Sequence, residues 1–433
     1  MTAPEVLWSP PADARATSRL GGFLDRLEQE HGLELADHEA AWQWSVDHIE
    51  DLWATVWDHF CVPGKHGDVT LAEAAMPGVK WFPNAELNYA EAALQMPDEA
   101  EAIVARSQSR REVRLSGRDL RDQVARCAAG LRRLGVRRGD RVAAYLPNIP
   151  EAVVAFLATA SIGAIWASCA PEFGTNAVVD RLSQIEPKVL LVVGGYRYGT
   201  KDIHRATEIR EIRDALPSVH CIVEVPYLPT TVPVPSAVAW GDLLAEHKEL
   251  VFARVPFDHP LYVLYSSGTT GLPKPIVHGH GGIVLEHLKA VGLYCDLGPG
   301  DRFFWFSTTG WMMWNFLVSG LLVGASIVLF DGNPGHPDLD NLWTLAEELE
   351  VTFFGVSAPF LMACRKEGLR PRDQHDLHKL RAVGSTGAPL PVDGFRWVYD
   401  AVGEHVMLSS ISGGTDVCTA FVGGSPMTEV RAG

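Results

Sequence analysis

Segments of helical and of extended character alternate through most of this chain, and that alternation restricts the folds open to it. In the first half, we predict helices over 120–135, 151–163 and 175–186, and strands over 141–147, 164–170 and 188–194. The second half continues with strands at 302–308 and 326–330, a helix and strand within 342–356, and a strand and turn at 381–389. Such βαβ units build parallel sheets covered by helices, so we expect an α/β fold.

The length of 433 residues exceeds what a single core supports, so two or more subdomains are expected. A proline-rich connection, VPYLPTTVPVP at 225–235, separates the two alternating halves. We therefore predict an N-terminal accessory segment over 1–90, a first α/β subdomain over 91–235 and a second over 236–433. The second would carry the glycine-rich loop and the further motifs described below.

Composition narrows the possible partners and the compartment. A formal net charge of −16 argues against broad binding to nucleic acid or to an anionic membrane. The seven cysteines are scattered, without a CxxC pair or a metal-like cluster, which fits free thiols in a reducing cytoplasm. We expect a cytoplasmic protein that binds neither nucleic acid nor a membrane. The sequence does not indicate its oligomeric state.

Two long uncharged stretches raise the question of membrane insertion. They cover 153–170 and 305–330, and both contain polar residues and glycine. Each has the length of a buried helix followed by a strand, and Gly324 would mark the turn in the second. The first residues show no basic region followed by an apolar one, so we expect no secretory signal.

A glycine- and hydroxyl-rich loop follows an apolar strand in LYVLYSSGTTGLPKPIVHGHGG, at 261–282. Glycines allow backbone N–H groups and hydroxyls to approach a phosphate closely, which makes this loop a candidate phosphate site. Its residues are Ser266, Ser267, Gly268, Thr269, Thr270 and Gly271, followed by Lys274. The loop lacks the GK[ST] ending of a Walker A motif, so a P-loop NTPase is not indicated. The alternative is a flexible linker.

Together with three further motifs, this loop resembles the phosphate-binding signature of the acyl-adenylate-forming enzymes. SSISGGTDV at 409–417 is similar to their second nucleotide motif, and GSTGAP at 384–389 to their adenine-contacting turn. FGTNAVVDRLSQIEPKVLLV at 173–192 is similar to the segment after their first helix–strand pairs. The resemblance implies the large N-terminal domain of such an enzyme, with two helix-covered, mostly parallel sheets.

Further phrases resemble the acetyl-CoA synthetase-like branch. WFPNAELNYAE at 81–91 is similar to its N-terminal signature. The segments at 6–27, 42–53 and 308–325 are similar to members that take acetoacetate in place of acetate. These members activate the acid as an acyl-adenylate, releasing pyrophosphate, and then transfer it to CoA. The resemblance thus implies ATP, Mg²⁺ and CoA as substrates or cosubstrate, and no tightly bound prosthetic group.

The resemblance also assigns residues to the phosphates and the adenine. Thr269, Thr270 and Lys274 would hold the β- and γ-phosphates, Thr415 would contact the α-phosphate, and Asp416 would orient Mg²⁺, directly or through water. Relatives usually have Glu at the position of Asp416, and the shorter side chain favours a water-mediated contact. A helix N-cap or Asx-turn is the alternative role for Asp416. Gly387, Ala388 and Pro389 would line the adenine, or form a simple structural turn.

The acyl pocket would be lined by Trp311, Met312 and Met313, although an aromatic and methionine stripe is often plain core. Gly413 stands where acetate enzymes place a bulky Trp. A pocket opened in this way suits a four-carbon β-keto acid, but butyrate would fit equally, because volume alone does not select a keto group.

For CoA, Arg197 occupies the position of a phosphate-contacting arginine in relatives, and Lys201 lies nearby. A solvated surface loop is the alternative for both. His278 and His280 follow the glycine-rich loop, and we interpret them as structural because a carboxylate nucleophile needs no general base.

The family pattern continues beyond the last residues of this sequence into a C-terminal lid, which we expect to be missing here. We expect these 433 residues alone to bind nucleotide weakly and to turn over very slowly. Three functions compete: an acetoacetate–CoA ligase, a ligase for another short or medium acid such as acetate or butyrate, and an inactive nucleotide-binding fragment.

Overall fold

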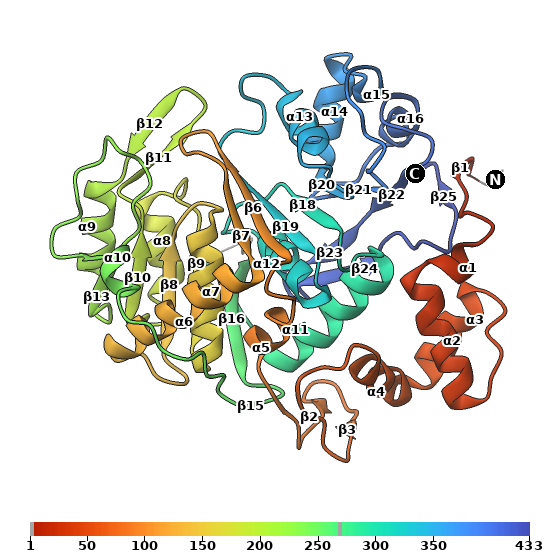
Figure 1. The fold of residues 1–433 in the computed structure, drawn as a ribbon, viewed down its shortest axis with the longest axis horizontal. Helices are drawn as coiled ribbons and strands as arrows, with labels where there is room; N and C mark the ends of the chain where they lie inside the picture. Colours follow the sequence, from red (N-terminus) through yellow and green to blue (C-terminus); the bar gives the residue numbers. More distant parts are fainter. Residues whose placement is uncertain (1–3, 267–270) are drawn as a thin grey trace.

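The structure is a computed structural model that describes residues 4–266 and 271–433. Two seven-stranded sheets form its centre (Figure 1). In each, six neighbouring strands run parallel and one edge strand is antiparallel. The predicted α/β class with two mostly parallel sheets is confirmed.

The first sheet has the order β14-β13-β10-β8-β9-β16-β17, with β17 as its antiparallel edge. Its strands are β8 (Arg141–Tyr145), β9 (Ile165–Cys169), β10 (Val189–Val192), β13 (Cys221–Glu224), β14 (Val238–Ala239), β16 (Pro260–Ser266) and β17 (Lys274–Gly279). The second has the order β22-β21-β20-β18-β19-β6-β7, with β7 antiparallel. Its strands are β6 (Glu101–Ser107), β7 (Val113–Ser116), β18 (Arg302–Trp305), β19 (Ser326–Asp331), β20 (Phe353–Ser357), β21 (Ala382–Thr386) and β22 (Met407–Ser410).

Both sheets take strands from both sides of the predicted boundary at residues 235 and 236. β6 and β7 belong to the segment 91–235 but pair in the second sheet, and β16 and β17 belong to 236–433 but pair in the first. The boundary therefore does not separate the strands of the two sheets. Each edge hairpin reaches its sheet through pairing that is distant in sequence, as between Ile327 and Ile103.

Helices cover both faces of the first sheet. Successive side chains of a strand point to opposite faces, so each strand contributes to the core on both sides. Val142 and Ala144 of β8 join the core that includes residues of α6 (Gly117–Arg133) and α7 (Pro150–Ile162). Ala143 and Tyr145 pack instead in the cluster with α8 (Thr175–Leu182) and α9 (Ala206–Ala215). β8 is therefore buried on both faces, as expected of a central parallel strand.

The remaining elements lie around these sheets. The other helices are α1 (Ala14–Thr17), α2 (Arg19–His31), α3 (His38–Asp47), α4 (Ile49–His59), α5 (Tyr89–Ala93), α10 (Trp240–Leu243), α11 (His280–His287), the π-helix η1 (Leu288–Tyr294), α12 (Met312–Val318), the 3₁₀-helix η2 (Ser319–Val323), α13 (Asn341–Glu348), α14 (Ala358–Lys366), α15 (Pro371–Gln374) and α16 (Val392–Ala401). The short strands are β1 (Val6–Trp8), β2 (Gly64–Lys65), β3 (Leu71–Glu73), β4 (Lys80–Trp81), β5 (Glu86–Leu87), β11 (Gly195–Tyr198), β12 (Lys201–His204), β15 (Val255–Pro256), β23 (Ser412–Gly414), β24 (Thr419–Val422) and β25 (Val430–Arg431).

The segment 1–90, whose helices are red in Figure 1, is joined to the rest of the molecule by pairing and by side-chain contacts. β1 pairs antiparallel with β25, from the other end of the chain. The backbone N–H of Arg19 donates to the Asp296 carboxylate over 2.8 Å. The predicted accessory segment therefore packs directly on the second half of the chain.

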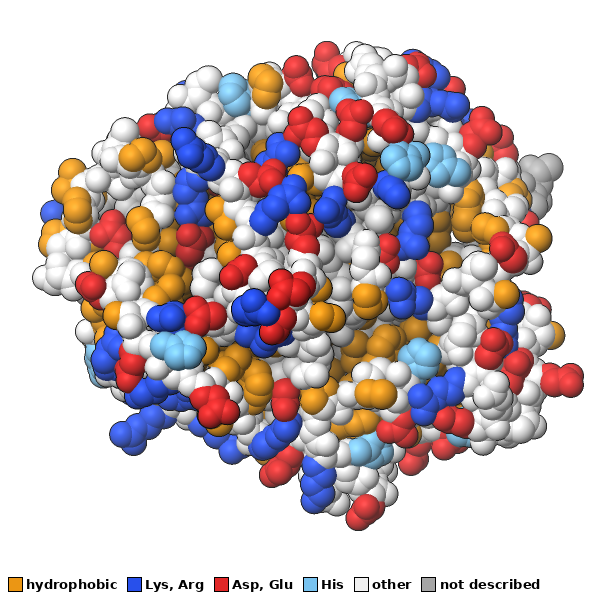
Figure 2. All heavy atoms as spheres, viewed as in Figure 1, with side chains coloured by type: hydrophobic (Ala, Val, Ile, Leu, Met, Phe, Trp, Pro, Cys, Tyr) orange, Lys and Arg blue, Asp and Glu red, His pale blue; other side chains and the backbone are white. Residues whose placement is uncertain are grey.

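Both uncharged stretches are buried inside the protein. The first contains most of α7, which is buried along its whole length except at Glu151. The second contains α12, η2 and β19, and Gly324 adopts a left-handed φ of 74° at the predicted turn. Within the described residues, no helix has the length and apolarity needed to cross a membrane. Acidic and basic side chains are interspersed over the face shown in Figure 2.

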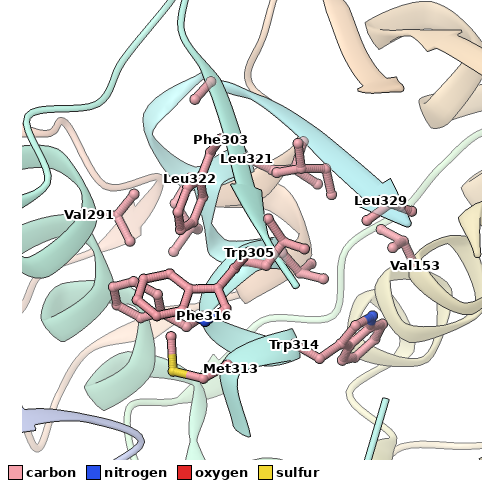
Figure 3. Close-up of a cluster of buried hydrophobic side chains, with 14 of the residues drawn as sticks. Val153, Val291, Phe303, Trp305, Met313, Trp314, Phe316, Leu321, Leu322 and Leu329 are labelled. Atoms are coloured by element: carbon pink, nitrogen blue, oxygen red, sulfur yellow. The ribbon is translucent and has the colours of Figure 1, made fainter. Parts of the chain in front are cut away.

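Aromatic side chains fill the core beside β18. Figure 3 shows Trp305, Phe316 and Met313 gathered between the strand and α12. The indole of Trp305 is fully buried and lies over two glycines, Gly355 on the adjacent β20 and Gly384 on β21 beyond it. A Cβ would come within 2.2 Å of the indole at Gly355 and within 2.6 Å at Gly384. Any side chain at these two glycines would collide with Trp305, so close packing fixes the residue type there.

The two sheets are joined by a buried seam, which we define as Asn148, Ser168, Thr309 and Trp314. The Ser168 hydroxyl donates to the Thr309 carbonyl over 2.6 Å, and the Thr309 hydroxyl donates to the Leu146 carbonyl over 2.6 Å. The Trp314 indole N–H donates to the Asn148 side-chain oxygen over 3.0 Å, and its ring stacks on that of Trp166 with centroids 6.3 Å apart. The ends of β8 and β9 are thus bonded directly to the segment after β18.

Two buried asparagines offer a matched stability test. Asn148 bonds Trp314 and the Phe330 carbonyl, whereas Asn315 is 2% exposed and neither polar atom of its amide has a partner among the described residues. We expect Asn148→Leu to lower the free energy of unfolding by about 2 kcal/mol, since it leaves the Trp314 N–H unpaired. We expect Asn315→Leu to be neutral or stabilising by about 1 kcal/mol. Chemical denaturation of the two variants checks this, and equal destabilisation would contradict it.

Candidate active site

The glycine-rich loop connects β16 to β17, whose residues Ser266 and Lys274 pair across the hairpin. Gly271 and Lys274 are exposed, and Ser266 is half-buried. The predicted phosphate contacts Ser267, Gly268, Thr269 and Thr270 lie outside the described residues. The hairpin places Lys274 at the open edge of the first sheet.

Thr415 and Asp416 lie in the turn between β23 and β24, which form an antiparallel pair. We call Thr415–Cys418 the catalytic turn, after the role predicted for Thr415 and Asp416, which stays a prediction. Thr415 is half-buried and Asp416 is exposed. Asp416 occupies a hairpin turn and not the start of a helix, so the helix N-cap alternative does not apply, whereas the Asx-turn alternative is not tested.

Side chains from the first sheet and α11 hold the catalytic turn. His278 Nε2 lies 2.9 Å from the Thr415 carbonyl, and His287 Nε2 lies 2.8 Å from the Cys418 carbonyl. The Tyr262 hydroxyl contacts Cys418 Sγ at 3.3 Å. The structure thus brings the strand that begins at Lys274 and the turn that carries Thr415 and Asp416 together.

The histidines beside the loop are kept neutral by burial. Burial lowers the pKa of His278, and the charge of Asp416 and the bond to the Thr415 carbonyl oppose that shift only in part. Burial also lowers the pKa of His280 to about 3 and that of His287 to about 4. His280 Nδ1 accepts the backbone N–H of Tyr89 over 3.0 Å. Each of these three rings therefore carries one N–H near neutral pH.

The predicted adenine turn follows β21 and lies beside the strand that leads to β23. Gly387 has a φ of 87°, which a glycine adopts without strain, and Ala388 and Pro389 are exposed. The Thr386 hydroxyl donates to the Ile411 carbonyl over 2.9 Å. A Cβ on Gly387 would lie 3.8 Å from the Trp311 ring. The adenine turn therefore lies beside Trp311 and is bonded to the segment that leads into β23.

The three residues predicted for the acyl pocket have different surroundings. Trp311 is half-buried beside Gly387. Met312 is 8% exposed and Met313 is 4% exposed, and Figure 3 shows Met313 among core aromatic rings. These surroundings set Trp311 apart as the member of the trio nearest the adenine turn. The assignment of all three to an acyl pocket stays a prediction.

Gly413 is constrained by its own hairpin. A Cβ at this position would lie 2.0 Å from the Thr419 carbonyl oxygen, in the backbone of the paired strand. The pairing of β23 and β24 shifts register between Ser412 and Gly413, which brings the two backbones close. This glycine thus has a local structural role that is independent of the volume of any acyl pocket.

Arg197 and Lys201 lie in the β11–β12 hairpin, where Arg197 pairs with Asp202. The guanidinium donates twice to that carboxylate, over 2.6 and 3.0 Å, and these bonds lower the pKa of Asp202. Lys201 is exposed. Arg197 therefore has an internal partner, in addition to any role toward a substrate.

Arg197 also lines a cavity of about 590 Å³, together with Arg106, Gln108 and His336. Gln108 closes one wall: its side-chain oxygen accepts the N–H groups of Gly199 and Asn333 over 3.1 and 2.9 Å. Its amide nitrogen donates to the carbonyls of Asn333 and His336 over 3.1 and 3.2 Å. Sequence reasoning missed these three residues, because they come from segments far apart in the chain and form no motif.

Comparison with known proteins identifies the class. Residues 89–432 match the family model described as AMP-binding enzyme, and residues 38–93 match that of the acetyl-coenzyme A synthetase N-terminus. The first match covers well over half of the chain, and the chain belongs to the AMP-binding enzyme family.

Within that family, the chain is similar to acetoacetyl-CoA synthetases. The enzyme of Rhizobium meliloti (strain 1021) is 42% identical over 440 residues, covering 100% of this chain and 67% of that protein. A solved structure, acetoacetyl-CoA synthetase from Streptomyces lividans, is 48% identical with a TM-score of 0.95, covering 99% of this chain and 68% of that one. A malonamoyl-CoA synthetase of Penicillium aethiopicum is 37% identical, covering 99% of this chain and 64% of that protein. The chain thus spans about two thirds of the length of these relatives.

The role of Gly413 can be tested with its neighbour. A Cβ on Gly414 would meet no atom within 4 Å, so Gly414→Ala is a matched control for Gly413→Ala. We expect Gly413→Ala to lower the free energy of unfolding by about 1 to 3 kcal/mol and Gly414→Ala to change it little. Thermal unfolding and amide exchange in 412–422 provide the measurements. Equal behaviour of the two variants would show that the hairpin accepts a side chain at 413.

Proposed function

We propose that the protein is an ATP-dependent, AMP-forming acid–thiol ligase that converts acetoacetate and CoA into acetoacetyl-CoA. The observation that carries the proposal is the docking of the catalytic turn on the strand that begins at Lys274, in a chain of the AMP-binding enzyme family. A carboxylate is a poor acyl donor. Attack of the carboxylate on the α-phosphate of ATP releases pyrophosphate and forms an acyl-adenylate. The thiol of CoA then attacks the acyl carbon and displaces AMP.

The residues of the site suit a reaction that concentrates negative charge. Lys274 is exposed at the edge of the first sheet and supplies a cation to the phosphates, and the Thr415 hydroxyl supplies a donor. Asp416 is an exposed carboxylate, which is the ligand type that Mg²⁺ takes from protein when phosphates provide the rest. Mg²⁺ would neutralise phosphate charge there.

Trp311 and the adenine turn would bind the base. Gly387, Ala388 and Pro389 offer backbone groups at an exposed turn, and the indole of Trp311 lies beside them. Ala388 has no side-chain hydrogen-bonding group, so recognition of the adenine would depend on backbone N–H and C=O groups and on contact with the ring. Met312 and Met313 would form the apolar floor behind Trp311.

The proposed acid rests on the relatives. Acetoacetate and malonamate both carry a carbonyl group two bonds from the carboxyl carbon, and the enzymes named for these acids are 42% and 37% identical to this chain. A shared β-carbonyl favours acetoacetate over acetate or butyrate, which lack it. The close backbone contact at Gly413 leaves the pocket-volume argument weaker than the sequence suggested.

For CoA, the cavity beside Arg197 offers two guanidinium groups, from Arg106 and Arg197. Guanidinium groups suit phosphates, although both are already paired, Arg197 with Asp202 and Arg106 with Glu348 over 2.8 Å. We propose this cavity for a phosphate-bearing part of CoA, with Lys201 at its rim. We also propose a cytoplasmic location, since all seven cysteines are free thiols.

The test is AMP formation with CoA by a chain extended to the length of the relatives. We expect the highest kcat/KM with acetoacetate and lower values with 3-hydroxybutyrate, butyrate and acetate, because these three acids lack a β-carbonyl. Malonamate, which has one, should give an intermediate value. A preference for acetate or butyrate would contradict the proposed acid. If none of these acids supports exchange of pyrophosphate into ATP, the proposed chemistry is contradicted.

A further inference from the structure

Two histidines hold the ends of the catalytic turn. His278 lies on β17, four residues after Lys274, and contacts the carbonyl of Thr415, the first residue of the turn. His287 lies at the end of α11 and contacts the carbonyl of Cys418, the last residue of the turn. The turn that carries Thr415 and Asp416 is therefore bonded at its first and last residues by two side chains from the segment that follows the glycine-rich loop.

The protons in these contacts are fixed by chemistry. A carbonyl oxygen can only accept, so Nε2–H of each ring is the donor. The second nitrogen of His287 accepts from the Ser319 hydroxyl over 2.6 Å, and the Tyr89 hydroxyl donates to Ser319 over 2.8 Å. Tyr89, Ser319 and His287 are almost completely buried, so this chain of hydrogen bonds has no competition from bulk water. It holds His287 in a single tautomer and orientation.

The turn has features that require such support. Cys418 has a φ of 53°, in the left-handed region that residues other than glycine rarely adopt. Its side chain is fully buried against the Tyr262 hydroxyl, while Asp416 two residues earlier is exposed. A backbone held in this conformation needs surrounding contacts that determine it. The two histidine bonds and the Tyr262 contact are such contacts.

We infer that His278 and His287 are positioning residues that fix the Thr415–Asp416 turn against the strand that begins at Lys274. β17 and the Thr415–Asp416 turn then keep a fixed relative position, and displacement of one displaces the other. Both histidines act through the backbone carbonyls of the turn. This inference rests on the proposed function, because Lys274, Thr415 and Asp416 are the residues proposed to bind the phosphates of ATP and Mg²⁺.

His280 is the control that distinguishes a histidine that positions the catalytic turn from one that only packs in the core. It is also fully buried and neutral and lies on α11, but its ring bonds the backbone N–H of Tyr89 and not the catalytic turn. Loss of His280 should therefore cost stability without altering the phosphate site. Glutamine offers the conservative replacement at 278 and 287, since its amide N–H₂ can donate to a carbonyl as Nε2–H does.

The experiment uses the extended chain with single variants His278→Leu, His287→Leu, His278→Gln, His287→Gln and His280→Leu. Acetoacetate-dependent exchange of pyrophosphate into ATP gives kcat and KM for each substrate. We expect the leucine variants at 278 and 287 to lose about tenfold to a hundredfold in kcat/KM for ATP, with KM for acetoacetate little changed. The glutamine variants should recover most of that loss, and His280→Leu should lower the thermal midpoint while keeping the exchange rate of the folded protein.

A second readout does not depend on activity. Hydrogen exchange at the backbone amides of 412–420 should accelerate in His278→Leu and His287→Leu but not in His280→Leu, because only the first two release the turn. The inference would be overturned if His278→Leu and His287→Leu showed the same amide hydrogen exchange at the turn, and the same kinetic losses, as His280→Leu. If the unsubstituted protein catalyses no pyrophosphate exchange, the proposed function fails, and the amide exchange still decides whether the histidines hold the turn.

Discussion

The buried seam between the two sheets is the contact on which the rest of the structure depends. Its hydrogen bonds run from the ends of β8 and β9 to Thr309, and the Trp314 indole is both bonded and stacked across it. Unpaired polar groups at such depth would be costly, so the seam tolerates only one relative placement of the sheets. The candidate site draws on both sheets, with Lys274 from the first and the adenine turn from the second. The seam therefore determines the position of Lys274 relative to the adenine turn.

Local patterns in the sequence predict most elements but not the pairing at the sheet edges. The helices and strands between 120 and 194 appear close to where periodicity and glycines place them, with Gly135 and Gly163 left-handed just beyond the ends of α6 and α7. α8 ends at Leu182, four residues before its predicted end. β6 and β16 were grouped with their neighbours in sequence, but each pairs in the other sheet. Strand pairing depends on contacts distant in sequence, and no period or turn signal records them.

For the candidate site, motifs predicted which segments converge but not how they are held. The roles of His278 and His287 were not visible because a histidine in an apolar segment has the same appearance whether it packs or bonds a distant carbonyl. Gly413 was interpreted through the side chain it lacks, whereas the structure shows a backbone contact that excludes any Cβ. In both cases the decisive partner, Thr415, Cys418 or Thr419, lies in a hairpin whose position is set by tertiary structure.

The side-chain amide of Gln108 has a consequence for the variation this fold can accept. It donates to two carbonyls and accepts two N–H groups, from the β11–β12 hairpin and the loop after β19. Glutamate has no donor, lysine has no acceptor, and asparagine is one methylene shorter. Glutamine is thus the one natural residue whose side chain has both the donors and the acceptor and the length to make these four hydrogen bonds. Among distant members of the family, its retention there would mark those that keep this hairpin in the same arrangement.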